Sequence, residues 1–155
     1  MSATQHHAIA YAALGFKILA LGAKSKRPHN ELAPRGMYSA TDDWETILTW
    51  FEKDPDINIG IHCKASNLVV LDVDTRNGGT TDGLPATRRI KTGNGFHYYY
   101  RCNPEMTFPG KWREGIDIKF NGYVVAAPSI HPNGHVYAVD DPMEIKPVEE
   151  LVGAR

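Results

Sequence analysis

The sequence has little of what marks a secreted or membrane protein. Its 155 residues include only two cysteines, Cys63 and Cys102, and neither belongs to a C-x-x-C pair. A disulfide framework and a cysteine zinc site are therefore not expected, and a reducing cytoplasm is the expected location. No apolar run approaches the roughly 18–20 residues of a membrane span, so no membrane partner is expected. The first residues also lack the charged-then-apolar pattern of a secretory signal.

An excess of one charge is missing too. The chain has 17 Lys and Arg against 18 Asp and Glu, a formal net charge of −1. Strong nucleic-acid binders often carry a basic excess, so the net charge gives no support to that class. Basic residues still cluster at 24–27, 88–91 and 111–119, and such clusters can form a positive cleft in a neutral protein. They are equally typical of a solvated surface.

The order of secondary-structure signals predicts an α+β fold in a single domain that spans residues 1–155. Helix patterns come early, over 4–14 and in a segment capped by Thr41 or Asp42. The second has a core stripe of Trp44, Ile47, Leu48 and Phe51. Strand patterns follow at 16–21, 58–62, 68–74, 88–92, 96–101, 116–120, 123–127 and 135–139.

Two turns predict β-hairpins, Gly93-Asn94-Gly95 and Asn121-Gly122. The tail after Pro142 is predicted to be a linker towards a downstream domain. The sequence has no glycine-rich dinucleotide fingerprint and no P-loop lysine motif, so a doubly wound parallel fold is not expected.

Two acids end an apolar strand in Leu68-Val69-Val70-Leu71-Asp72-Val73-Asp74. Alternation puts Asp72 and Asp74 on one face, with Cα atoms about 6–7 Å apart. A divalent cation between them would remove their repulsion, and oxygen ligands favour Mg²⁺ or Mn²⁺ over zinc. The D-x-D pair is weak by itself, because two acids can simply begin a solvated turn.

A third acid, Asp117, shares a strand face with Lys119 in Ile116-Asp117-Ile118-Lys119-Phe120. An aspartate among apolar residues needs a partner, which is either a metal or a basic neighbour such as Lys119 or Arg113. Three carboxylates on neighbouring strands are what a two-metal site for phosphoryl transfer requires.

The strand after the glycine turn carries His97 and Arg101 on one face. The imidazole of His97 can hydrogen-bond a phosphate oxygen, and Arg101 can add charge on the same face. A histidine in a strand is more often structural, but the alternating polar face favours a binding role.

These motifs, in this order, resemble the bifunctional primase-polymerase (prim-pol) domain of the archaeo-eukaryotic primase superfamily. The resemblance covers roughly residues 8–137. Its main markers are Val70–Asp74, Thr92–Tyr100, Gly115–Lys119, Gly122–Ser129 and His131–Gly134.

The resemblance implies an RRM-like antiparallel palm joined to an N-terminal αβ module. Asp72, Asp74 and Asp117 match the family's catalytic metal ligands for Mg²⁺ or Mn²⁺, and His97 matches the histidine that contacts the nucleotide triphosphate. The implied activity is a DNA primase and DNA polymerase that acts on a single-stranded DNA template and primer with NTP or dNTP. A helicase domain on a longer chain or a partner, in a bacterial, archaeal, phage or plasmid replication context, is also implied.

Further nucleotide contacts are expected from residues near these motifs. Lys119 would neutralise phosphate, and Lys26 would face phosphate or template. Ser129 and His131 would line the nucleotide pocket or shape the Pro-Asn-Gly turn. The chain departs from the family at Gly95, where a serine is frequent, at Asn94, where a glycine is frequent, and at Ala127, where a proline is frequent.

Two other functions are compatible with the same residues. One is a metal-dependent glycosyltransferase or phosphoesterase that uses the D-x-D pair. The other is a non-catalytic module that binds single-stranded DNA with a primase-like fold. The positions of His97 and Asp117 on predicted hairpins argue against the first. The intact set of three acids and a histidine argues against the second, because clustered carboxylates repel one another and a module without catalysis has no physical reason to keep them.

Overall fold

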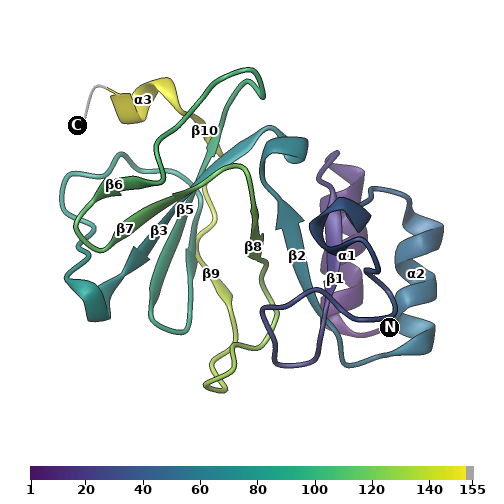
Figure 1. The fold of residues 1–155 in the computed structure, drawn as a ribbon. Coiled ribbons are helices and arrows are strands. Elements are labelled where there is room, and N and C mark those ends of the chain that lie inside the picture. The colour runs from purple at the N-terminus through teal and green to yellow at the C-terminus, as the bar shows by residue number, and fades with distance from the viewer. Residues whose placement is uncertain (153–155) are drawn as a thin grey trace.

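The computed structural model describes residues 1–152, which form an α+β domain with two mainly antiparallel sheets (Figure 1). The helices are α1 (Ala3–Ala13), α2 (Trp44–Lys53) and the short α3 (Glu149–Val152). The strands are β1 (Ile18–Leu21), β2 (Asn58–His62), β3 (Leu68–Asp74), β4 (Arg89–Lys91), β5 (Gly95–Arg101), β6 (Lys111–Arg113), β7 (Ile116–Lys119), β8 (Tyr123–Val125), β9 (Ala138–Asp141) and β10 (Lys146–Pro147). Short 3-10 helices occupy three connections, η1 (Gly36–Ser39), η2 (Lys64–Ser66) and η3 (Thr75–Asn77). No helix within residues 1–152 is long and apolar enough to cross a membrane.

The second helix confirms part of its predicted core stripe, because Ile47 and Phe51 are buried. Its N-cap is Asp43, whose carboxylate accepts a hydrogen bond from Thr46 N at 3.3 Å, rather than Thr41 or Asp42. Trp44 is 55% exposed, so its prediction as a core residue was wrong. Leu48 is half-buried, and Trp50 is a further buried residue of this helix.

The smaller sheet has the order β1-β2-β8, with both pairs antiparallel. The predicted hairpin at Asn121-Gly122 is therefore wrong, because β7 and β8 belong to different sheets. Gly60 of β2 pairs with Val125 of β8, while β7 pairs with β3 and β6. The strands on the two sides of the turn each pair with a strand from elsewhere in the sequence, β7 with β3 and β8 with β2. These non-local pairings replace the local hairpin.

The larger sheet has the order β6-β7-β3-β5-β4-β9, with β10 added parallel to β5. The hairpin of β4 and β5 around Gly93-Asn94 is confirmed, and Thr92 N donates to Gly95 O at 2.9 Å. The register places Asp72 of β3 opposite both His97 of β5 and Asp117 of β7.

The two faces of this sheet pack against different cores. Val70 and Tyr99 face the helices and the smaller sheet, whereas Leu71 and Tyr100 belong to a second core on the other face. Because strand side chains alternate, the face that carries Val70 also carries Asp72 and Asp74, and these acids lie beyond the edge of the first core.

The tail after Pro142 packs onto the domain over the described residues, and a downstream domain stays a prediction. β10 pairs with the end of β5, and Val148 N donates to Arg101 O at 2.8 Å. Val148 and Leu151 are 1% and 4% exposed in the second core. Burial of these two side chains stabilises the tail against the sheet.

Candidate functional site

Asp72 is the centre of the site because two strands place polar residues on either side of it. His97 lies opposite it on β5 and Asp117 opposite it on β7. Directly opposed residues in antiparallel strands point to the same face, about 4.5–5.5 Å apart. The expected arrangement of acids on neighbouring strands is therefore present.

His97 is only 6% exposed, and its Nε2 lies 3.5 Å from Asp72 Oδ1. Its Nδ1 is buried and has no hydrogen-bond partner among the residues that the structure describes. A buried polar atom without a partner is uncommon in a folded protein and marks a site of strain, function or an unseen ligand.

The carboxylate of Asp72 stays ionised although its surroundings are partly dry. Burial alone would raise its pKa, but the hydrogen bond and charge of His97, with Lys119 and Lys26, hold the pKa of Asp72 below its ordinary value. An ionised oxygen in a cleft is the state that a metal ligand needs.

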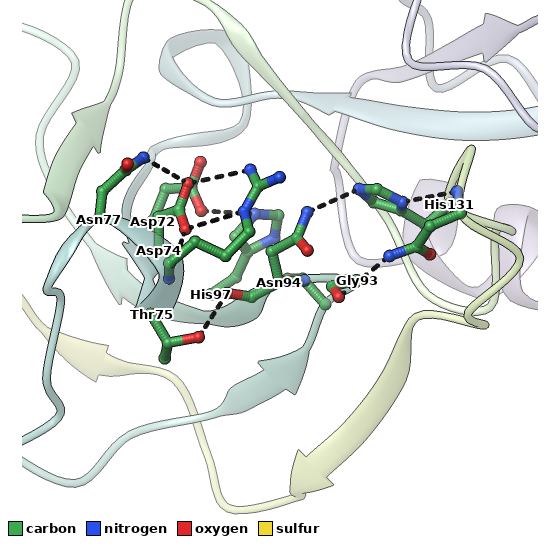
Figure 2. A network of polar contacts seen from close by, with 11 residues as sticks. Asp72, Asp74, Thr75, Asn77, Gly93, Asn94, His97 and His131 are labelled. Atoms are coloured by element: carbon green, nitrogen blue, oxygen red, sulfur yellow. Dashed lines mark hydrogen bonds and ion pairs between the residues drawn. The ribbon is translucent and has the colours of Figure 1, made fainter.

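Asp74 is held differently from Asp72. Its carboxylate accepts hydrogen bonds from the backbone and side chain of Arg76 and from Asn77 Nδ2 (Figure 2). These Arg76 contacts hold the pKa of Asp74 below its ordinary value, against burial and the charge of Asp72. Within residues 1–152, no three His, Cys, Asp or Glu side chains converge as a set of ion ligands.

Three cavities meet at Asp72. The large cavity, about 390 Å³, lies at the seam between the two sheets and is lined by Lys26, Met37, Asp72, His97, Lys119, Gly122, Tyr123, Val124, Val125 and Tyr137. The small polar cavity, about 60 Å³, is lined by Lys26, Asp72, Val73, Asp74, Arg76, Thr92, Asn94, His97, His131 and Tyr137. The acidic cavity, about 360 Å³, is lined by Asp72, Asp74, Asn77, Lys111, Glu114, Gly115 and Asp117. The three predicted acids thus share one cavity.

Lys26 reaches the site from the loop after β1. Tyr123 Oη donates to Lys26 O at 2.7 Å, which fastens this loop to β8. Lys26 lines both the large and the small polar cavity, and Lys119 lines the large one. Both predicted lysines therefore lie beside Asp72.

His131 lies on the far wall of the small polar cavity and is 8% exposed. Its Nδ1 accepts a hydrogen bond from Asn133 N at 3.0 Å, and its Nε2 lies 3.4 Å from Asn94 Nδ2 (Figure 2). Burial, followed by the charge of Lys26, lowers the pKa of His131. The lowered pKa favours the neutral form of the ring at this wall.

Two predicted nucleotide contacts lie elsewhere. Ser129 is buried, and its Oγ accepts from Ile59 N at 2.9 Å and donates to Ile59 O at 3.2 Å. Arg101 stands at the other end of β5 from His97, donates to Ile145 O at 2.9 Å, and lines a separate cavity. The structure does not bring these two side chains to Asp72.

Gly95 explains one departure from the family pattern. A Cβ on this residue would lie 1.8 Å from Val73 O. The backbone of β5 approaches β3 too closely here for any side chain, so the frequent serine has no room in this chain.

Sequence reasoning gave no role in the site to Arg76, Thr92 or Tyr137, which line the small polar cavity. Tyr137 is 3% exposed, and its ring centroid lies 6.1 Å from that of His97 and 5.9 Å from that of His131. Burial, with the charge of Asp72, raises its pKa to about 12, so the hydroxyl keeps its proton. The sequence signal for Arg76 was its position two residues after Asp74, directly before Asn77.

Comparison with known families gives one match over most of the chain. Residues 8–151 match the family described as bifunctional DNA primase/polymerase, N-terminal. A comparison with curated proteins finds no match.

Proposed function

Since this chain belongs to the bifunctional DNA primase/polymerase family, we propose that it is a template-directed DNA primase and DNA polymerase. The observation that carries the proposal is the register that sets Asp72 between His97 and Asp117, where three cavities meet. We assign the larger sheet to the RRM-like palm of the archaeo-eukaryotic primase fold, and α1, α2 and the smaller sheet to its N-terminal module.

The acids fit a site for Mg²⁺ or Mn²⁺ by their chemistry. Asp72, Asp74 and Asp117 supply hard oxygen ligands from two adjacent strands and line the same cavity. Two bound ions would activate the attacking 3′-hydroxyl and neutralise the leaving pyrophosphate. The chain holds Asp72 ionised, which keeps this ligand ready at neutral pH.

The incoming nucleotide would lie across the two cavities that share Lys26, His97 and Tyr137. Its triphosphate would occupy the small polar cavity, where Lys26, His97 and His131 provide positive charge and hydrogen-bond donors. Its sugar and base would occupy the large cavity, whose walls include the apolar Met37 and Val125.

The reaction would be in-line attack of a primer 3′-hydroxyl on the α-phosphate, with pyrophosphate leaving. The role of the chain is to position the phosphates and to stabilise the charge that moves onto the leaving group. Single-stranded DNA template, primer and NTP or dNTP are the partners, and a helicase domain on the parent chain or a partner would supply unwinding.

The testing experiment is primer extension on single-stranded DNA with Mg²⁺ or Mn²⁺, with each nucleotide pool, for wild type and Asp72→Asn. We expect metal-dependent extension that falls by at least about a hundredfold in the variant, which keeps the side-chain shape and removes the charge. Asp56→Asn, an exposed acid away from the three cavities, is the matched control. Wild-type-like extension by Asp72→Asn would refute the proposal.

A second candidate is a non-catalytic module that binds single-stranded DNA. The observation in its favour is that the carboxylate of Asp74 is already engaged by Arg76 and Asn77. This candidate would be selected if the folded wild type binds DNA but extends no primer with either metal and binds no nucleotide in calorimetry.

A further inference from the structure

The carboxylate of Asp74 has no free acceptor position. Its Oδ1 accepts from Arg76 N at 3.0 Å and from Arg76 Nε at 3.4 Å. Its Oδ2 accepts from Arg76 Nη2 at 3.2 Å and from Asn77 Nδ2 at 3.0 Å. A carboxylate offers about four lone-pair positions, so these contacts saturate it. An ion could therefore use Asp74 only after a donor has left.

The backbone around Asp74 is fixed, so the donor that leaves must be a side chain. Asp74 N donates to Gly115 O at 2.7 Å, and Gly79 N donates back to Asp74 O at 3.0 Å. Thr75 N and Oγ1 both donate to Asn94 O. A Cβ on Gly79 would lie 2.5 Å from Gly115 O, which shows how closely these segments are packed.

The guanidinium of Arg76 is the group that is free to move. Its side chain is 64% exposed, so it can leave Asp74 without disturbing either core. It also lines the small polar cavity together with Lys26, His97 and His131. Among the described residues, Arg76 is the one basic side chain in an ion pair with Asp74.

We propose that Arg76 is an exchangeable counter-ion, which caps Asp74 in the empty site and transfers to the nucleotide triphosphate when the site is loaded. This inference rests on the proposed function. An ion at Asp74 repels the guanidinium, and the polyphosphate in the adjoining cavity attracts it. Arginine suits this exchange because its planar fork matches carboxylate and phosphate oxygens alike.

The exchange predicts effects of opposite sign on two binding reactions. Arg76→Gln removes the competitor for Asp74, so Mn²⁺ alone should bind about three- to tenfold more tightly. The same variant loses a phosphate contact, so dATP should bind the Mn²⁺-loaded protein about tenfold more weakly. Arg76→Lys keeps the charge and loses the fork, so it should recover part of the dATP affinity.

The measurements are titration of free Mn²⁺ by electron paramagnetic resonance and calorimetry of dATP binding, on the whole chain. The matched control is Lys17→Gln, which removes a cation from an exposed ion pair with Asp42, 2.8 Å long, in the N-terminal module. Neither constant should change in the control.

The outcomes separate this inference from the function on which it rests. Opposite shifts in Arg76→Gln support the exchange. If wild type binds Mn²⁺ in a manner lost in Asp72→Asn, but Arg76→Gln leaves Mn²⁺ binding unchanged or weakens it, the exchange is overturned and the metal site stands. Absence of any Asp72-dependent Mn²⁺ binding in wild type would overturn both.

Discussion

Asp72 and His97 lie directly opposite each other on β3 and β5, with His97 Nε2 3.5 Å from Asp72 Oδ1. A half-exposed acid is thus paired with an imidazole that is almost wholly buried. The pair connects the proposed metal site with the proposed triphosphate site, because Asp72 lines the acidic cavity and His97 lines the small polar cavity.

Replacement of His97 should therefore weaken nucleotide binding more than it destabilises the fold. His97→Gln removes the ring donor while keeping a polar side chain of similar reach. We expect dATP affinity to fall by about ten- to a hundredfold, as for loss of a hydrogen bond to a charged group. Calorimetry measures the affinity and circular dichroism checks the fold. Unchanged affinity in a folded variant would remove His97 from the phosphate site.

Lys26 should act through charge and through the fixed position of its loop. Lys26→Gln is expected to raise the KM for nucleotide about two- to tenfold, with a smaller effect at high salt. Tyr123→Phe should raise KM less, because it removes only the bond from Tyr123 Oη to Lys26 O. Lys53→Gln, at the exposed end of α2, is the control. A salt-independent effect of Lys26→Gln would contradict the electrostatic role.

Gly93 leaves the space that the ring of His131 occupies. A Cβ on Gly93 would lie 2.4 Å from His131 Cγ and Cδ2. Gly93→Ala should therefore lower the free energy of unfolding by about 1–3 kcal/mol and displace His131. Urea unfolding measures the loss. Gly110→Ala, where a Cβ would meet no atom within 4 Å, should be nearly neutral. Equal stability of the two variants would refute the packing argument.

Ser129 should be important for stability, since its hydroxyl bridges the loop after β8 to β2. Ser129→Ala leaves Ile59 N without this acceptor, whereas Ile59 O keeps the hydrogen bond from Ala126 N. The expected cost is about 1–3 kcal/mol in urea unfolding, as for a buried group left unsatisfied. Ser39→Ala removes an exposed hydrogen bond to Arg35 N and should cost no more than about 0.5 kcal/mol. A similar small loss in Ser129→Ala would argue against the bridge.

His131 should contribute to the loss of folding stability at acidic pH. Burial and the charge of Lys26 lower its pKa in the folded protein. The folded state then binds fewer protons than the unfolded state, so stability is present above about pH 6.5 and is lost as pH falls below it. His131→Gln should flatten the decline in unfolding free energy between about pH 7 and pH 5. An unchanged slope would contradict the depressed pKa.

Much of the site follows from sequence because strand alternation and a tight turn fix relative positions. The Gly93-Asn94 turn sets the β4–β5 hairpin, and alternation puts Asp72 and Asp74 on one face. The expected neighbouring-strand position of Asp117 follows once β7 joins β3. The metal and nucleotide roles of these residues remain predictions.

Other features could not be read from local patterns. Alternation puts Arg101 on the face of His97, but four residues of strand separate the two by about 13 Å, so the shared face does not bring Arg101 to the site. The Asn121-Gly122 turn encodes a reversal but not the partner of β8, which comes from residues 58–62. The contact of Arg76 with Asp74 depends on a surface side-chain conformation that no periodicity records.

The pairing of β8 with β2 also constrains how the chain can reach its native state. β2 is the middle strand of its sheet, yet its second neighbour lies about sixty positions further along the chain. A nascent chain that ends before Tyr123 leaves that edge of β2 open, and open edges template association with other chains. Pairings of such long sequence separation also slow folding. Synthesis through Val125 is thus the step that closes the N-terminal sheet and lowers its tendency to aggregate.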